Sequence, residues 1–152
     1  MKRYKKKRYI IDAMKIKPGE EVYNFLEDCC HLSTEMDCIK IIGTVGEEWL
    51  VNTYELIRTY AFANGTPITC DNIPNGVFKI TPKDTTETIF AEQVKDEQKV
   101  ITIWGRILTA NGSGISHGDG DFIVYGNLHG KPNHHDRWVV NGRVFVNTYQ
   151  EV

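Results

Sequence analysis

Short runs of alternating apolar and polar residues dominate the chain, and their period of two is typical of β-strands. Residues rich in turn formers, such as Pro18-Gly19 and Asn75-Gly76, separate these runs. The pattern predicts strands at 9–16, 37–43, 48–51, 77–80, 88–94, 98–108, 121–126 and 138–140. The segments 109–120 and 127–136 are predicted as a glycine-rich loop and a polar loop.

One segment has helical spacing instead. Its apolar residues recur at i, i+3, i+4, i+7 and i+8, which places them in a single stripe. Two acidic residues stand in the first turn, where the helix dipole favours negative charge. We therefore expect one amphipathic helix at about 20–30, packed on the sheet through Val22, Phe25, Leu26, Cys29 and Cys30.

Two segments of the chain resemble each other without gaps. Residues 49–60 and 138–149 share the frame W-[LV]-V-N-x-x-x-[LF]-[IV]-x-T-Y. The chain is thus predicted to contain two related W-x-V-N…T-Y β units. The polar middle of the frame is ambiguous: Asn52 and Glu55 have the spacing of a capping box, whereas Asn141-Gly142 is typical of a two-residue hairpin. The sequence leaves a hairpin and a helical turn open at both places.

The length and composition suit a compact α+β fold that is predominantly antiparallel sheet. With 152 residues, of which 41% are hydrophobic, a single domain over 1–152 can bury an adequate core. Possible sub-units are 9–60 and 77–152, joined by a loop at 61–76. We expect no transmembrane helix and no signal peptide, and a cytoplasmic protein that associates with itself through exposed strand edges. The four cysteines lack zinc spacing and are interpreted as reduced thiols.

Positive charge is concentrated at the N-terminus. Six of the 18 basic residues lie within seven positions, although the formal net charge of the chain is −2. Such an arm could bind nucleic acid. We favour a solvated arm, because the rest of the chain lacks a basic stripe. The residues of this alternative nucleic-acid site are Lys2, Arg3, Lys5, Lys6, Lys7 and Arg8.

The glycine-rich and polar loops contain the other candidate chemistry. The loop at 109–120 lacks a phosphate-binding motif, and its acidic residues do not complete a calcium loop. Four of the five histidines follow within 19 residues: His117, His129, His134 and His135. With nearby aspartates these could bind a transition metal, and the alternative metal site is His117, Asp119, His134 and Asp136. Solvated histidines on loops are the favoured interpretation, with no metal or other cofactor.

The strand predicted at 98–108 presents different residues on its two faces. Trp104 and Arg106 share one face with Val100, and the other face is rich in isoleucine. A tryptophan can stack on a base, and an arginine can pair with a phosphate. A candidate anion-binding site therefore combines this face with the polar loops: Trp104, Arg106, Asn111, His117, Lys131 and Arg137.

Both ends of the chain resemble a family of small bacteriophage and prophage proteins. The opening, residues 2–13, resembles the M-[RK]-Y-[RK]-K…V-[IV]-E-A start of that family. Residues 87–94 and 100–105 resemble two further segments of it, and residues 120–126 resemble its G-D-[YF]-[IV]-[IV]-x-G motif. The F-x-x-T-Y ending is present at 145–149. Asp119 stands where the family has proline. The resemblance implies a phage accessory protein in the cytoplasm of a host bacterium, with no catalytic residues to transfer.

These observations favour a non-catalytic binder. The expected partner is a small anionic, nucleotide-like ligand that the protein sequesters, or a host or defence protein that it inhibits. The first alternative is a metal-dependent hydrolase or transferase that uses the histidine region. The second is a nucleic-acid-binding accessory protein that uses the basic arm. We expect no membrane partner.

Overall fold

A computed structural model describes residues 1–26, 28–33, 38–83, 85–112 and 120–152. Within these ranges the chain is mostly antiparallel strand with two short helices, which confirms the predicted α+β class. The chain divides into two compact units, and each is described separately. Unit 1 consists of Met1–Lys7 and Thr86–Val152, and unit 2 of Arg8–Thr85.

Unit 2 is a continuous stretch of chain built on a five-stranded sheet with the order β6-β5-β2-β8-β7. A hairpin, β3–β4, follows β2, and a helix, α1, joins β6 to β7. The elements are β2 (Ile11–Lys15), β3 (Glu21–Asn24), β4 (Cys29–Leu32), β5 (Cys38–Ile42), β6 (Glu48–Asn52), α1 (Thr53–Thr59), β7 (Tyr60–Phe62) and β8 (Phe78–Pro82).

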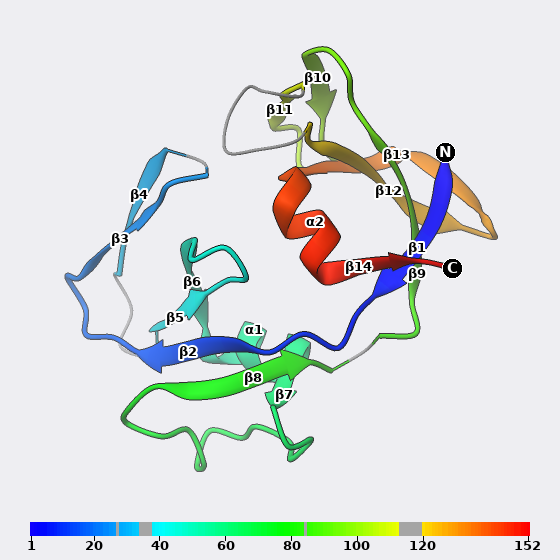
Figure 1. Cartoon of the computed structure of the whole chain (residues 1–152). Helices are drawn as coiled ribbons and strands as arrows, with labels where there is room; N and C mark the ends of the chain where they lie inside the picture. The colour runs from blue at the N-terminus through cyan, green and yellow to red at the C-terminus, as the bar shows by residue number, and fades with distance from the viewer. Residues whose placement is uncertain (27, 34–37, 84, 113–119) are drawn as a thin grey trace. The chain divides into compact units, whose positions relative to one another are not determined.

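Unit 1 has the same arrangement, but one of its strands comes from the N-terminus. Its sheet has the order β13-β12-β9-β1-β14, so β1 lies between β9 and β14 (Figure 1). The β10–β11 hairpin follows β9, and α2 joins β13 to β14. The elements are β1 (Lys2–Lys6), β9 (Thr88–Gln93), β10 (Gln98–Ile101), β11 (Ile107–Ala110), β12 (Phe122–Leu128), β13 (Lys131–Val140), α2 (Gly142–Thr148) and β14 (Tyr149–Glu151).

The two sheets correspond residue by residue, as the shared W-x-V-N…T-Y frame predicts. A strand ladder of unit 1, Trp138–Val124–Ala91, has its counterpart in Trp49–Ile41–Ala13 of unit 2. The first residues after the helices, Tyr149 and Tyr60, pair with Lys6 and Pro82 at the same point of the edge ladder. In this correspondence β1 of unit 1 takes the place that β8 has in unit 2. The basic N-terminal segment is therefore an internal strand of a sheet, not the solvated arm that we expected.

The structure decides the ambiguity in the middle of the frame: both segments are helical. The side chain of Asn52 accepts a hydrogen bond from the Glu55 N–H at 2.8 Å and caps α1. The side chain of Asn141 caps α2 by accepting from the N–H groups of Arg143 and Val144. An asparagine at the N-cap satisfies donors that the first helical turn leaves free. Gly142 is thus the first residue of a helix and not part of a hairpin turn.

The prediction of an amphipathic helix at about 20–30 is wrong. This segment forms the β3–β4 hairpin, in which Val22 is buried and its neighbours Glu21 and Tyr23 are exposed. The side chain of Asn24 accepts the N–H of Leu26 at 3.0 Å, which competes with a helical hydrogen bond. Asp28 has a φ of 48°, outside the right-handed helical region. Local turn chemistry at Asn24 and Asp28 therefore overrides the helical spacing of the apolar residues.

The prediction of a single strand at 98–108 is also wrong, because this segment forms a hairpin. β10 ends at Ile101, and β11 begins at Ile107. The hydroxyl oxygen of Thr102 accepts the Arg106 N–H at 3.2 Å, and Gly105 has a φ of 80° that favours glycine. Trp104 and Arg106 consequently belong to the turn and do not share a strand face with Val100.

The polar loop predicted at 127–136 is wrong for most of its length. β12 and β13 are joined by a two-residue turn, His129-Gly130, with φ values of 54° and 82°. Positive φ at both positions is characteristic of the type I′ hairpin turn. His134 and His135 therefore lie in β13, beside the register shift at Tyr125/Gly126.

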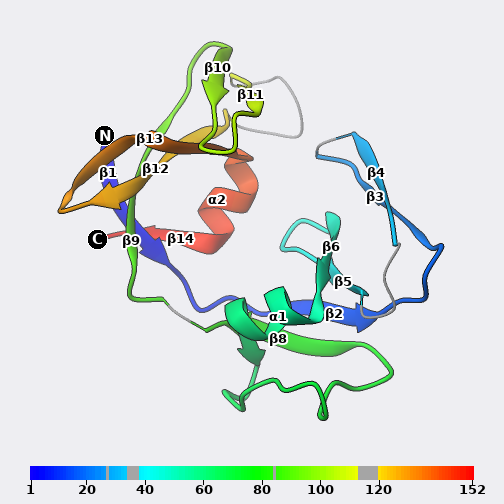
Figure 2. The same ribbon diagram turned by 180° about the vertical axis from the view of Figure 1, so that it is seen from behind.

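Each unit has a separate apolar core between its sheet and its helix. Leu56 of α1 and Phe145 of α2 occupy corresponding positions and are buried almost completely. Figures 1 and 2 show α2 against one face of the unit 1 sheet. A second cluster, built on Val100, Ile123 and Tyr125, packs the β10–β11 hairpin against the opposite face.

The boundaries of the units differ from the expected sub-units 9–60 and 77–152. β7 and β8 both belong to unit 2, and β1 belongs to unit 1, because strand pairing and not chain order determines the division. None of the helices in the described ranges has the length and apolar character needed to cross a membrane.

Candidate functional site

The outer face of the unit 1 sheet, opposite α2, carries a row of four directly paired residues. Phe90 of β9 pairs with Arg3 of β1 on one side and with Tyr125 of β12 on the other, and Tyr125 pairs with Arg137 of β13. Directly paired residues have their side chains on the same face of a sheet. We call Arg3, Phe90, Tyr125 and Arg137 the aromatic row. It places two rings between two arginines: Tyr125 is buried in the cluster that packs the β10–β11 hairpin on this face, and Phe90 is partly buried beside that cluster.

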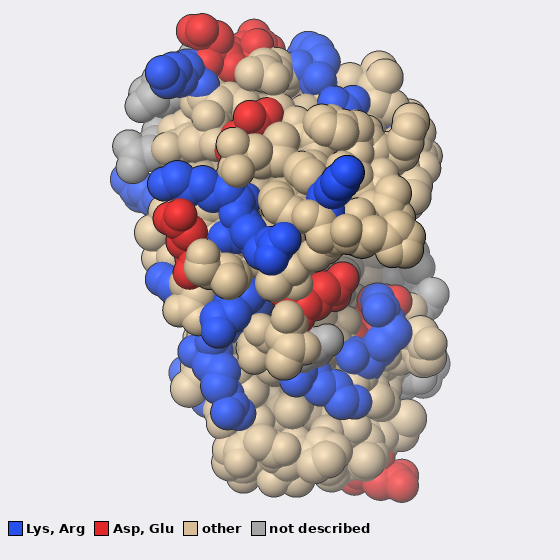
Figure 3. All heavy atoms as spheres, turned by 90° about the vertical axis from the view of Figure 1, so that its right-hand side faces the viewer, with Lys and Arg blue, Asp and Glu red and all other residues tan. Residues whose placement is uncertain are grey.

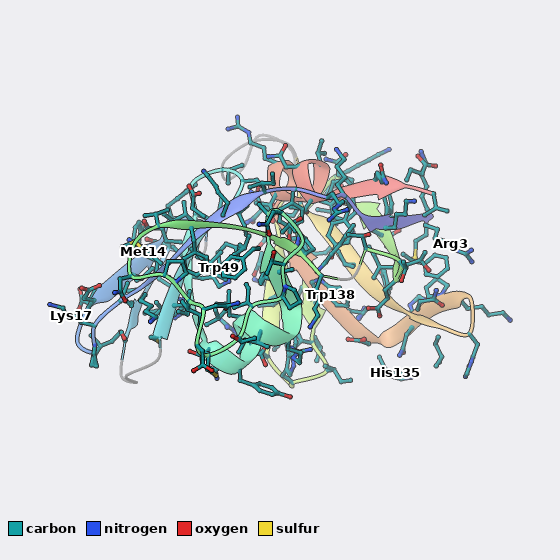
Figure 4. The ribbon with its side chains drawn as sticks, turned by 90° about the horizontal axis from the view of Figure 1, so that it is seen from below. Arg3, Met14, Lys17, Trp49, His135 and Trp138 are labelled. Carbon is teal, nitrogen blue, oxygen red and sulfur yellow. The ribbon has the colours of Figure 1, made fainter. Side chains whose placement is uncertain are left out.

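The first half of the row is a cation–π pair. The guanidinium carbon of Arg3 lies 5.2 Å from the centre of the Phe90 ring. Arg3 is exposed and also donates a hydrogen bond of 3.3 Å to the carbonyl of Gly130, in the β12–β13 turn. Figure 4 shows Arg3 extending toward that hairpin. The positive charge is therefore held at the surface, above an aromatic ring that is only partly buried.

The second half of the row is fixed by polar contacts to the Tyr125 hydroxyl. Tyr125 donates to the Oε1 atom of Glu92 at 3.0 Å, and its ring meets that of His134 edge-on at 5.1 Å. Burial and the Glu92 carboxylate raise the pKa of Tyr125, whereas the hydrogen-bonded Arg137 guanidinium opposes this shift. Tyr125 therefore interacts with carboxylate, guanidinium and imidazole side chains around its ring. The Nε atom of Arg137 is buried and has no hydrogen-bond partner among the described residues.

The corresponding row of unit 2 has different chemistry. Its members, in the same order, are Lys79, Asp12, Ile42 and Glu48. Lys79 forms an ion pair of 2.6 Å with Asp12, and Glu48 lies 3.5 Å from Lys40. Charges of opposite sign neutralise each other there, and no aromatic ring is present in the row. Because the two sheets share one register, the aromatic row is a feature of unit 1 and not a requirement of the fold.

The structure brings together only part of the site expected from the sequence. Arg137 belongs to the row, and Lys131 directly follows the glycine whose carbonyl binds Arg3. Trp104 and Arg106 lie in the exposed turn of the β10–β11 hairpin. The expected residue Asn111 has a structural role: its N–H donates to Asp121 at 2.9 Å. His117 lies outside the described residues.

The buried carboxylate of Asp121 connects three segments of unit 1. It accepts the N–H groups of Asn111 and of Gly142, the first residue of α2. Burial raises its pKa, and the two N–H groups act in the opposite direction. Asp121 therefore anchors the start of β12 to α2 and supplies no ligand-binding group.

The alternative metal site is only partly within the described structure. Among the described residues, no three His, Cys, Asp or Glu side chains are placed to share a metal ion. His134 packs on Tyr125, and His129 is a turn residue. His117 and Asp119 lie outside the described ranges.

The basic N-terminal residues are partly occupied by contacts within unit 1. Lys2 lies 3.5 Å from Glu151, and Lys7 donates to the carbonyl of Val146 at 2.8 Å. Lys5 and Arg8 make no ion pair with the described residues. On the face shown in Figure 3, basic side chains are interspersed with acidic and uncharged ones.

Sequence reasoning missed Phe90 and Tyr125, and placed Arg3 in a different site. The alternation in β9 separates Phe90 from the buried residues Ile89 and Ala91. The sequence alone therefore allows the prediction that Phe90 lies on the opposite face of the strand from these two residues. The residues beside Phe90 in the sheet, Arg3 and Tyr125, could not be predicted in this way, because they depend on the pairing of β9 with β1 and β12.

A second buried carboxylate, Glu47 of unit 2, makes the stability of that unit depend on pH. Burial raises the pKa of Glu47, against the backbone N–H groups of Thr44, Val45 and Glu47 itself, which lower it. The folded state then holds the proton more tightly than the unfolded state does. The resulting stabilisation is complete below the unfolded pKa and is lost as the pH rises through the higher, folded pKa. We expect Glu47→Gln to remove this loss. As the pH rises, the free energy of unfolding of the variant should therefore increase relative to that of the wild type.

Urea unfolding of both proteins from acid to neutral pH measures this difference. Glu21→Gln, which replaces an exposed carboxylate of the same unit, is the control for the loss of one negative charge. If Glu47→Gln and the wild type had parallel pH profiles, Glu47 would not be the titrating group.

No protein-family model, curated protein or solved structure matches the chain.

Proposed function

We propose that the protein is a non-catalytic binder that takes a small anionic, nucleotide-like ligand on the aromatic row of unit 1. The observation that carries the proposal is the contrast between corresponding rows: Arg–Phe–Tyr–Arg in unit 1 and Lys–Asp–Ile–Glu in unit 2. One fold with one register has an ion-paired row in one copy and, in the other, a row with two arginines, the partly exposed ring of Phe90 and the buried ring of Tyr125.

The chemistry of the row suits both parts of a nucleotide. A base stacks on aromatic rings, and each stacked base contributes about 1–3 kcal/mol in proteins that bind single strands. Phosphate oxygens accept charge-assisted hydrogen bonds from guanidinium groups. The unpartnered Nε of Arg137 supports the same proposal, because a buried donor without an acceptor is costly unless a ligand oxygen satisfies it.

The size of the row favours a ligand longer than one phosphate group. Arg3 and Arg137 are separated by three strand spacings, which is about 14 Å. An extended nucleotide can place a base over Phe90 while its phosphate groups reach the arginines. Mononucleotides, dinucleotides and single-stranded oligonucleotides share this chemistry, so the test has to distinguish them.

The binding test uses calorimetric titration of the wild type with ATP, the dinucleotide pApA, a short oligothymidylate and inorganic pyrophosphate. We expect at least one base-containing ligand to bind more tightly than pyrophosphate. Arg3→Gln and Arg137→Gln should each weaken that binding at least about tenfold, since one charge-assisted contact is worth about 1.5–3 kcal/mol. Phe90→Leu should weaken the binding of the base-containing ligand and leave the binding of pyrophosphate unchanged.

Lys79→Gln is the matched control, because Lys79 occupies the position of Arg3 in the unit 2 row. It should leave the affinity unchanged. The proposal fails if none of the base-containing ligands binds, or if Lys79→Gln reduces the affinity as much as Arg3→Gln does. A ligand that is hydrolysed during the titration would favour an enzyme over a binder.

The setting that we propose for this binder is a phage accessory protein in the cytoplasm of a host bacterium. Support comes from the resemblance of residues 2–13, 120–126 and 145–149 to small phage and prophage proteins. Sequestration of a host signalling nucleotide would fit both this setting and the chemistry of the aromatic row. Inhibition of a host or defence protein is the other role that we propose for such a binder.

A further inference from the structure

The turn of the β10–β11 hairpin exposes an unusual concentration of large apolar side chains. Ile101, Ile103, Trp104 and Ile107 are between 57% and 73% exposed, and we call these four residues the hairpin patch. Ile101 and Ile107 are directly paired across the hairpin, and the other two residues lie in the turn that joins their strands. Single exposed apolar residues are ordinary, whereas several on one short hairpin indicate a contact surface.

The inner side of the same hairpin already has its partner. Val100 and Ala110 are fully buried in the cluster that includes Ile123 and Tyr125. The patch is therefore on the side that points away from the sheet, and it contributes nothing to the core of unit 1. Figure 1 shows the hairpin at the periphery of unit 1.

The corresponding hairpin of unit 2 is more polar at the same place. Tyr23 and Cys30, which are paired across β3–β4, replace Ile101 and Ile107. The hydroxyl of Tyr23 donates to Asp28 at 2.7 Å, so this exposed ring ends in a solvated polar contact. As with the aromatic row, the hairpin patch is present in unit 1 and not in unit 2. The shared topology of the two units therefore does not require it.

We propose that the hairpin patch binds the same patch of a second copy of this chain and forms a twofold-symmetric dimer. Within the described structure, β10 and β11 pair only with each other, so this two-stranded ribbon has strand edges that a second ribbon can approach. The polar residues around the patch have both signs: Glu97 and Lys99 lie 3.5 Å apart, and Arg106 is at the turn. A twofold contact can set the acidic group of each copy against a basic group of the other, which makes the surface self-complementary.

The area of the patch agrees with a dimer of moderate affinity. Covering four side chains of this size on both copies removes roughly 1,000 Å² of accessible surface, which is near the lower limit for a specific interface. Trp104 is the most exposed of the four. Tryptophan is also the residue type that most often dominates the binding energy of such contacts.

Analytical ultracentrifugation of the full-length chain over a wide concentration range tests the proposal. We expect the wild type to sediment as a dimer that dissociates on dilution. Trp104→Ser should weaken dimerisation at least about tenfold, the effect of losing one interface hot spot. Ile107→Lys should give a monomer at every concentration, because it would bury a charge in the apolar contact on both copies.

The control is Tyr54→Ser, which removes an aromatic side chain of similar exposure, 70%, from α1 of unit 2. It should dimerise like the wild type. Ile101→Thr keeps a β-branched residue in the strand and should weaken the dimer while the circular dichroism spectrum is unchanged. A wild type that is monomeric at all concentrations overturns the proposal, and so does a dimer that tolerates both Trp104→Ser and Ile107→Lys. Equal weakening by Tyr54→Ser would also overturn it.

Discussion

Replacing Phe145 by alanine is expected to lower the free energy of unfolding of unit 1 by about 3–5 kcal/mol, as for other fully buried aromatic residues. Phe145 is 1% exposed. Its ring stacks on Phe122 with centroids 3.9 Å apart and on Tyr149 at 4.8 Å, and it meets the edge of Tyr4 at 4.9 Å. The substitution leaves a cavity where α2, β12, β14 and β1 converge. Hydrogen exchange of unit 1 amides as a function of denaturant measures the loss.

The matched variant in unit 2 is Leu56→Ala. Leu56 is completely buried and has the same place in the repeated frame. It should lower the protection of unit 2 amides by about 2–5 kcal/mol. A loss of less than about 1 kcal/mol for Phe145→Ala would mean that the aromatic cluster does not hold α2 on its sheet.

Much of this cluster was accessible from the sequence, because it follows from the repeat. The frame shared by 49–60 and 138–149 places Leu56 and Phe145 at one position, and the structure confirms that position as the buried side of a helix. The strand character of β2, β5, β9 and β12 was equally clear from alternation or from β-branched content. Where local propensity and burial agree, the sequence alone is sufficient to predict the element and its buried face.

The errors occurred where short-range geometry competes with periodicity. Residues 20–30 have an apolar stripe with helical spacing, yet the side-chain contact of Asn24 and the positive φ of Asp28 produce a hairpin. In 98–108 the five residues from Thr102 to Arg106 reverse the chain. A period calculated over ten residues is insensitive to a single turn, so one strand or helix is predicted where two strands exist.

The candidate site depended on long-range pairing, which periodicity does not contain. Arg3 and Phe90 are far apart in sequence and meet only because β1 inserts between β9 and β14. The expected ligand residues were collected from one predicted strand face and from the polar segments that follow it in the sequence. Of these, Arg137 lies in the aromatic row and Lys131 near it, because both belong to β13, which pairs with β12.

Deleting residues 1–7 is expected to unfold unit 1 while unit 2 keeps its structure. The deletion removes β1, an internal strand of the unit 1 sheet, together with the Tyr4 ring that packs on Phe145 and Phe122. β14 pairs with β1 and with none of the other described strands, so its partner is lost as well. Unit 2 begins at Arg8 and has all five of its sheet strands within Arg8–Thr85. Two-dimensional NMR of the truncated chain should show dispersed signals from unit 2 only.

The deletion can be separated from a simple loss of positive charge. A variant with Lys2, Lys5 and Lys7 replaced by glutamine keeps β1 and Tyr4, and should retain the signals of both units. Adding a synthetic peptide of residues 1–8 to the truncated chain should restore the unit 1 signals, because the vacated position between β9 and β14 accepts one strand of that sequence and register. If the truncated chain instead kept a folded unit 1, β1 would be dispensable to the sheet. The basic segment would then be available as an arm for nucleic acid, and binding of the truncated and full-length chains to an oligonucleotide at low salt would decide that role.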